Sequence, residues 1–267
     1  MRWTAAFPMY NVSAQVAAGY EALFEALVDV LRAEGMVDAI EFEHAPLLPD
    51  FWQRPDLLLS QTCGYPYMTQ LRGHVHLLAT PAYVFDGCTG PDYASAIVVR
   101  DGGAIAILAD ARGRRAAVND AHSNSGMNAL RHAVAPLALN GRFFSGVTWS
   151  GSHRASLALV QNGEADLAAI DCVTLGYLRR EQPSSLEGIT ILQYSAPSPG
   201  LPFVVGAAVP EGVRQCLRHA LLAPAAGLAG VMPALSISHF APCSTRDYER
   251  IGALEAEACA RGYPHLA

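Results

Sequence analysis

The sequence alternates between short apolar runs and amphipathic stretches along most of its length. The stretch 17–34 shows the second kind, because Tyr20, Leu23 and Leu27 recur at helical spacing within it. Gly35 follows directly, as is typical of the residue after a helix. Apolar runs such as 56–60 predict buried strands. Strands that alternate with helices imply parallel sheets with right-handed crossovers, so the pattern predicts an α/β fold.

The same reading predicts the individual elements. Strands are expected at 2–7, 40–43, 56–60, 75–79, 93–100, 115–119, 146–149, 167–170, 190–194 and 202–209. Helices are expected at 17–34, 66–71, 105–110, from 125 onward, and at 153–162, 173–180, 211–222 and 245–261. The apolar stretch 220–237 is interrupted by prolines and glycines, which favours two short core helices over a membrane span.

Two segments rich in proline and glycine, 81–91 and 196–202, predict crossings between two lobes. We therefore expect a discontinuous first lobe, 1–85 plus 200–267, and a second lobe, 86–199. Each lobe would hold a mainly parallel sheet flanked by helices. Two lobes joined by two crossings predict a ligand cleft and closure by a hinge.

The residue content excludes several kinds of chemistry. All 18 cationic side chains are arginine, so neither a Walker A lysine nor a Schiff-base lysine is available. The formal charge is −6 without a long basic stretch, which argues against nucleic acid as a partner. The six cysteines form no CxxC pair, so we expect no structural zinc and no dense disulfide framework, although one bridge stays open. No cofactor is predicted.

The segment 119–130 holds the clearest candidate site. A predicted strand ends at Asn119, and Ser123, Asn124, Ser125 and Gly126 then open a helix. A helix start presents unpaired N–H groups with a partial positive charge, and adjacent hydroxyls add donors for an oxyanion. An ordinary capped helix would explain the same residues.

A second helix start and a strand end add to this candidate site. The segment 150–157 opens a helix with serine hydroxyls and His153. Asp171 follows the predicted strand 167–170, and in open α/β sheets that end of a strand faces the ligand. Asp171 would accept from a protonated oxygen or an ammonium group, or it would simply cap the next helix.

These segments resemble the phosphate, phosphite and phosphonate-binding proteins of ABC importers, which have the type II periplasmic-binding fold. The resemblance rests on the Ser-Asn-Ser-Gly helix start, on Gly-Ser-His-Arg-Ala-Ser-Leu, and on Gly-Glu-Ala-Asp-Leu-Ala-Ala-Ile-Asp. It implies that Ser123, Asn124, Ser125 and Gly126 hold an anion. It also implies a ligand contact for Asp171 and for an aromatic near the first crossing, at the position of Tyr93.

Further candidates lie near the same strand ends. Tyr10 follows the first strand, and Gln61 and Thr62 follow the third. His122 stands beside the hydroxyl-rich turn, where an anion would favour its charged form, or it packs against the turn. His74 and His76 share one face of a strand, but no third ligand is near, so no metal site is predicted.

The favoured interpretation is a solute-binding protein for an ABC importer, with a small anionic or zwitterionic ligand, an ABC permease as partner, no direct membrane span and no catalysis. The alternative is a cytoplasmic enzyme or ligand sensor on the same fold, similar to chorismate dehydratases or thiamine-precursor synthases. Residues 1–7 run into a strand without a signal peptide. This predicts a cytoplasmic protein as written, or a periplasmic one if the sequence is the processed form.

Overall fold

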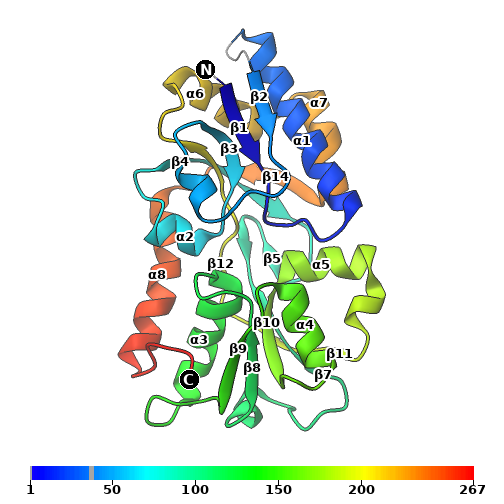
Figure 1. Ribbon diagram of the computed structural model, residues 1–267, viewed down its shortest axis with the longest axis vertical. Coiled ribbons are helices and arrows are strands. Elements are labelled where there is room, and N and C mark those ends of the chain that lie inside the picture. Colours follow the sequence, from blue (N-terminus) through cyan, green and yellow to red (C-terminus); the bar gives the residue numbers. More distant parts are fainter. Residues whose placement is uncertain (1, 36–38) are drawn as a thin grey trace. The chain divides into compact units, whose positions relative to one another are not determined.

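Two α/β units, each with its own open sheet, make up the chain (Figure 1). The computed structural model describes residues 2–35 and 39–267. Unit 1 consists of Met1–Val84, Thr89–Asp92 and Pro199–Tyr248, and unit 2 of Phe85–Cys88, Tyr93–Ser198 and Glu249–Ala267. The α/β class expected from the alternating pattern is confirmed.

Unit 1 is built on a six-stranded sheet in the order β14-β4-β13-β3-β1-β2. The strands are β1 (Arg2–Ala6), β2 (Ala39–Phe42), β3 (Leu57–Gln61), β4 (Val75–Tyr83), β13 (Phe203–Gly206) and β14 (Ile237–Ala241). β1 runs parallel to β2 and β3, whereas β13 is antiparallel to both β3 and β4. The carboxyl ends of β1, β3 and β4 therefore lie at one edge of the sheet.

The helices of unit 1 bury apolar stripes that the sequence already shows. They are α1 (Ala14–Ala33), α2 (Gly64–Thr69), α6 (Glu211–Leu222) and α7 (Ala226–Val231), with 3-10 turns η1 (Asp50–Gln53) and η6 (Met232–Leu235). The Ser13 hydroxyl caps α1 by accepting from the Val16 N–H at 3.1 Å. α1 buries Tyr20, Leu23 and Leu27 and packs against α6 and α7.

Unit 2 is built on a five-stranded sheet in the order β11-β7-β10-β8-β9. The strands are β7 (Ser95–Arg100), β8 (Arg115–Val118), β9 (Gly146–Trp149), β10 (Leu167–Asp171) and β11 (Ile189–Tyr194). β8 is parallel to β9 and β10, while β7 is antiparallel to β10 and β11. One edge of this sheet thus collects the carboxyl ends of β8, β9, β10 and β11 and the amino end of β7.

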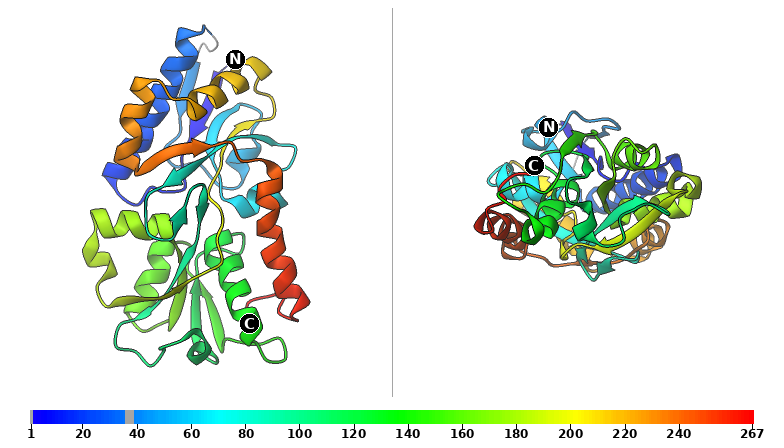
Figure 2. Two further views of the ribbon diagram at one scale, coloured as in Figure 1. Left: turned by 180° about the vertical axis from the view of Figure 1, so that it is seen from behind. Right: turned by 90° about the horizontal axis from the view of Figure 1, so that it is seen from below.

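Two helices of unit 2, the fourth and fifth of the chain, start at strand exits that the side chains of Ser152 and Asp171 cap. The helices of this unit are α3 (Ala129–Val134), α4 (His153–Gln161), α5 (Cys172–Glu181) and α8 (Thr245–Ala260), with the short turns η2 (Leu108–Ala111), η3 (Asn124–Asn128), η4 (Ala135–Leu137) and η5 (Pro183–Leu186). η3 is a π-helical turn that leads into α3. α8 begins in unit 1 and continues in unit 2. Both views show it beside α3 (Figures 1 and 2), where Arg131 pairs with Glu255 at 3.2 Å.

Three short strands, β5 (Cys88–Thr89), β6 (Asp92–Tyr93) and β12 (Ser198–Pro199), lie where the chain passes between the units. They pair in the order β12-β6-β5. Pro199, the last residue of β12, is followed by Gly200, whose N–H donates to the Pro91 carbonyl at 2.8 Å.

The structure differs from the sequence-based expectations at several points, and β5 and β12 are among the elements that were not expected. The helix expected at 105–110 is only a 3-10 turn, η2, because the Asp110 carboxylate accepts from the N–H groups of Ala106 and Ile107 and holds them outside a helix. β14 was not predicted. Residues 249–267 belong to unit 2, whereas the sequence-based division placed all of 200–267 in the first lobe.

The stretch 220–237 contains α7, η6 and the start of β14. Pro233 lies in the first turn of η6, and Ser236, with φ of 53°, ends it. Across residues 2–35 and 39–267, no helix is both long enough and apolar enough to cross a membrane.

Candidate functional site

The edge of the unit 2 sheet where β8, β9 and β10 end gathers most of the predicted residues. Ser123 follows β8, His153 follows β9, and Asp171 is the last residue of β10. Because these strands are parallel neighbours, their exits lie side by side. Polar residues at three adjacent exits can therefore act on one ligand.

Ser123, Ser125 and His153 form a hydrogen-bonded cluster at this edge, which we call the serine–histidine cluster. The Ser125 hydroxyl lies 2.9 Å from Nε2 of His153, and 3.4 Å from the Ser123 hydroxyl. The Ser123 Oγ also accepts from the Gly126 N–H at 2.9 Å, which caps η3. Ser123 and Ser125 are both buried. The cluster presents neutral donors and carries no cationic side chain.

The His153 ring is neutral at neutral pH. Burial of the ring lowers its pKa to about 4, and the nearby Ala169 carbonyl only partly offsets that effect. The residue as a whole is half-buried, so the ring nitrogens are more enclosed than the side chain overall. Nδ1 is buried and makes no hydrogen bond of acceptable geometry. Among residues 2–35 and 39–267, no carboxylate hydrogen-bonds to Nδ1 of this imidazole in the way that the acidic member of a Ser-His-Asp triad does.

The side chain of Asn119 approaches the start of η3 so closely that position 126 has no room for a Cβ atom. A Cβ atom on Gly126 would lie 1.7 Å from Oδ1 of Asn119 and 3.4 Å from Cε1 of His153. Oδ1 of Asn119 is itself buried without a hydrogen-bond partner. The sequence pattern indicates Asn119 only as the end of a strand. The signal that could have identified it is a polar residue at a strand exit, seven positions before a helix-opening glycine.

Asn124 and Tyr93 belong to a network beneath the cluster. Nδ2 of Asn124 donates to the Tyr93 hydroxyl at 3.1 Å and to the Ser198 hydroxyl at 2.8 Å. Oδ1 of Asn124 accepts from Asn128 at 3.0 Å. Both amide hydrogens of Asn124 are therefore used within unit 2, where they fix the turn. Ser198 was interpreted only as part of a crossing, so its polar role was missed.

Asp171 is 2% exposed and caps α5. Its Oδ1 accepts from the N–H groups of Val173 at 2.8 Å and Thr174 at 3.1 Å. The capping alternative considered from the sequence is thus realised through Oδ1. His122, by contrast, is exposed, and its backbone N–H donates to the Asp120 carboxylate at 2.6 Å.

The predicted residues of unit 1 lie at the edge where β1 and β3 end. Tyr10, Gln61 and Thr62 are all buried. Nε2 of Gln61 donates to the Tyr83 hydroxyl at 3.2 Å and to the Leu201 carbonyl at 3.1 Å, while its Oε1 is buried without a partner. The Tyr10 ring meets the Tyr83 ring edge-on at 5.5 Å. The Thr62 hydroxyl donates to the Cys63 carbonyl at 3.3 Å.

His74 and His76 are exposed near the start of β4. Within the described ranges, no group of three or more His, Cys, Asp or Glu side chains is placed to hold a metal ion.

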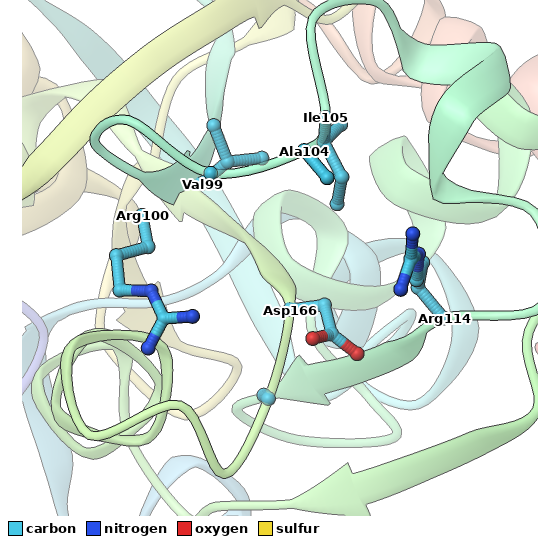
Figure 3. A pocket seen from close by; sticks show the side chains of 8 residues that line it. Val99, Arg100, Ala104, Ile105, Arg114 and Asp166 are labelled. Carbon is cyan, nitrogen blue, oxygen red and sulfur yellow. The ribbon is translucent and has the colours of Figure 1, made fainter.

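A pocket of about 100 Å³ lies at the opposite edge of the unit 2 sheet (Figure 3). Figure 3 shows the side chains of Arg100, Arg114 and Asp166 around it. Asp166 pairs with Arg115 at 3.2 Å, and the hydrogen bonds from Arg115 help to keep the pKa of that carboxyl low despite its partial burial. None of the predicted ligand residues lines this pocket. Its lining is Val99, Arg100, Gly103, Ala104, Ile105, Arg114, Ala165 and Asp166.

The family is decided by a match over most of the chain. The model of the family described as "ABC transporter, phosphonate, periplasmic substrate-binding protein" matches residues 9–248. The chain belongs to this family. Membership of the phosphonate-binding family implies a small ligand and an ABC permease as partner. No curated protein matches the sequence.

Solved structures of similar fold include members of the same class. The binding protein component of an ABC phosphonate transporter from Pseudomonas aeruginosa has a TM-score of 0.79 at 19% identity, over 98% of this chain and 87% of that chain. PhnD1 from Prochlorococcus marinus, in complex with methylphosphonate, has a TM-score of 0.74 at 13% identity, over 96% and 97%. The periplasmic aliphatic sulphonate-binding protein SsuA from Escherichia coli has a TM-score of 0.60 at 13% identity, over 100% and 89%. These likenesses establish the two-lobed periplasmic-binding fold.

Proposed function

We propose that this chain captures a small solute carrying an oxyanion, such as a phosphonate, phosphate or sulfonate, for an ABC importer. The observation that carries the proposal is the serine–histidine cluster, in which Ser125 lies 2.9 Å from His153 and 3.4 Å from Ser123. Neutral hydroxyl and imidazole groups at a helix start bind an oxyanion through hydrogen bonds without a lysine. Similar proteins in complex with methylphosphonate and named for aliphatic sulphonates support this ligand class.

Buried polar atoms without partners occur at the strand exits of each unit. Oδ1 of Asn119 and Nδ1 of His153 in unit 2 and Oε1 of Gln61 in unit 1 are buried and make no hydrogen bond to the described residues. Such atoms cost about 1–3 kcal/mol each unless something pairs with them, so a ligand that hydrogen-bonds to them would recover that cost.

The predicted residues divide into groups with different roles. Ser123, Ser125 and His153, with the backbone of Asn124 and Gly126, hold the oxyanion. Asp171 accepts from a protonated oxygen or an ammonium group of the same ligand. Further contacts come from the aromatic and amide residues at the strand ends and from the exposed histidine beside the turn, namely Tyr93, Tyr10, Gln61, Thr62 and His122.

Binding is favoured over catalysis by the state of His153. A pKa of about 4 leaves the ring neutral, and no carboxylate is bonded to its Nδ1. A Ser-His pair without that carboxylate has no group to stabilise the imidazolium that nucleophilic catalysis forms.

The proposal is tested by calorimetry of methylphosphonate and of a short alkanesulfonate on Ser125→Ala. A hydrogen bond to a charged group contributes about 1.5–3 kcal/mol, so we expect affinity to fall roughly ten- to a hundredfold. Ser185→Ala is the matched control, because that hydroxyl bonds the Gln182 carbonyl within η5, in the same unit. Equal affinities for Ser125→Ala and wild type would move the oxyanion site elsewhere.

Closure on the ligand is tested separately by small-angle X-ray scattering. Prolines and glycines at both crossings motivate the expectation of a hinge. Saturating ligand should reduce the radius of gyration of the wild-type chain. If calorimetry confirms binding but the scattering profile is unchanged, the proposal of hinge closure is contradicted, whereas the proposal of the oxyanion site is not.

A further inference from the structure

Cys88 and Cys172 lie against each other in unit 2, although 84 residues separate them in the sequence. Their sulfur atoms are 3.4 Å apart. Cys88 opens β5, at a crossing segment, and Cys172 opens α5, directly after Asp171. Neither forms a disulfide in the structure, where both are free thiols.

The segment that carries Cys88 is held against α5 on several sides. The Phe85 ring meets the Tyr177 ring edge-on at 4.9 Å, and Asp86 pairs with Arg179 at 3.1 Å. Gly87 has φ of 91°, and a Cβ there would lie 2.9 Å from Cβ of Cys172. The glycine therefore permits a backbone approach that a larger residue would prevent. The two thiols are neighbours because the packing around them fixes both backbones.

We propose that Cys88 and Cys172 form a dithiol site that closes to an intrachain disulfide by exchange with an external disulfide. A disulfide bond is about 2.05 Å long, so the sulfurs need to approach by only a little over an ångström from their present separation. Rotation of the two side chains supplies such a movement while the backbone contacts persist. This site is independent of the proposed function.

The exchange proceeds in two balanced steps. The Cys88 thiol is half-exposed, so an external disulfide can reach it. Its thiolate, formed by release of the proton to solvent, attacks one sulfur of a disulfide such as oxidised glutathione. This forms a mixed disulfide and expels one glutathione thiolate, which takes up a proton. Cys172 then loses its proton, attacks the Cys88 sulfur and expels the second glutathione. Two protein thiols are oxidised, and one glutathione disulfide is reduced to two thiols.

Cys172 suits the second step rather than the first. It is 1% exposed, so an external disulfide cannot reach it. The hydrogen bond with Cys88, burial and the nearby Asp171 charge raise the pKa of the Cys172 thiol above its ordinary value. Its attack is therefore confined to a sulfur that is already in contact with it, which is the sulfur of Cys88.

Peptide mapping of the folded wild-type chain tests the site. The reduced protein is incubated with oxidised glutathione, blocked with iodoacetamide and digested with trypsin. Trypsin cleaves only after arginine in this lysine-free chain, so the two cysteines fall in the separate peptides 73–100 and 155–179. We expect a cross-linked pair of these peptides, lighter by two hydrogen atoms than their sum, and a parallel loss of both alkylated peptides.

Two variants and one condition complete the experiment. Cys88→Ser should abolish the cross-linked pair, while Cys259→Ser, which removes an exposed cysteine elsewhere, should leave it unchanged. In concentrated urea, the same oxidation should give a mixture of disulfides among the six cysteines. The proposal is overturned if the folded wild type yields no 73–100/155–179 pair, or yields it no more than the urea-unfolded chain does. The comparison of the folded with the urea-unfolded wild-type chain is sufficient to test the proposal, even if a variant does not fold.

Discussion

The Ser125 hydroxyl lies 2.9 Å from Nε2 of His153, and these two residues come from neighbouring strand exits that are 28 positions apart in the chain. The contact joins the start of η3 to the start of α4. It also places a neutral imidazole within hydrogen-bond distance of a buried hydroxyl. The pH behaviour of the protein should therefore report on His153.

The free energy of unfolding should fall as the pH drops from about 6.5 to about 4. An unfolded histidine has a pKa of about 6.5, whereas burial lowers that of His153 to about 4. In this range the unfolded chain binds a proton that the folded chain does not, so folding stability is lost as pH falls, by up to about 3 kcal/mol. His153→Gln should flatten this dependence in urea titrations at about pH 4.5 and pH 7. The exposed His74→Gln serves as control, and parallel profiles for wild type and His153→Gln would contradict the assignment.

Asp171→Asn should separate the capping role of Asp171 from its proposed ligand role. An asparagine Oδ1 can still accept from the N–H groups of Val173 and Thr174, so stability should change little. The lost charge should weaken binding of an aminoalkylphosphonate by about tenfold or more, and binding of an alkanesulfonate much less. Calorimetry with both ligands measures the difference. Equal losses of affinity for the two ligands would show that Asp171 does not recognise the ammonium group.

Tyr248→Phe should destabilise unit 1. The buried Tyr248 hydroxyl lies 2.7 Å from the Thr80 hydroxyl and donates to the Gly200 carbonyl at 2.7 Å. Removing it leaves the Gly200 carbonyl buried without this donor, so we expect a loss of about 1–3 kcal/mol in chemical unfolding. Tyr194→Phe, at a half-buried ring in unit 2, is the control and should change stability by much less. A loss no larger than that of the control would argue against this account.

Most of the fold could be predicted from local patterns. The apolar stripe of α1 has a helical period, and the apolar run at 56–60 predicts a buried strand, which the structure has at Leu57–Gln61. β14 was missed because its residues continue an apolar stretch with prolines and glycines that reads as helix. Its strand identity comes from pairing with β4, in which Ile237 lies opposite Tyr83 and Ala241 opposite Thr80, and a partner so distant in the sequence leaves no local signal. Residues 249–267 likewise carry no local signal of the unit to which they belong, so a division by sequence order places them in the first lobe.

The candidate site could be predicted in its residue types but not in its contacts. Ser123, Ser125 and His153 stand at helix starts, so their positions follow from capping patterns. Their mutual bonding depends on the order of β8 and β9 in the sheet, which the sequence does not state. Asn119 and Ser198 were missed as polar partners for the same reason, since each meets its neighbour only in the folded unit.

Gly126→Ala should destabilise unit 2, because the added methyl group would lie 1.7 Å from Oδ1 of Asn119. Overpacking of this kind costs about 1–3 kcal/mol. Gly252→Ala, in α8 with open space around it, is the control and should be neutral or slightly stabilising. Asn119→Ala removes the obstructing atoms, so the double variant should unfold at a higher urea concentration than Gly126→Ala alone. Additive effects of the two changes would contradict a direct clash.

The close approach of Asn119 to Gly126 also determines the order in which these two residues can be substituted during evolution. A lineage can shorten residue 119 first and enlarge residue 126 afterwards, since the space is then available. The reverse order passes through an intermediate in which two groups occupy one volume. Alanine at 126 should therefore arise only on a background that has already lost the asparagine, and glycine should persist wherever the asparagine does.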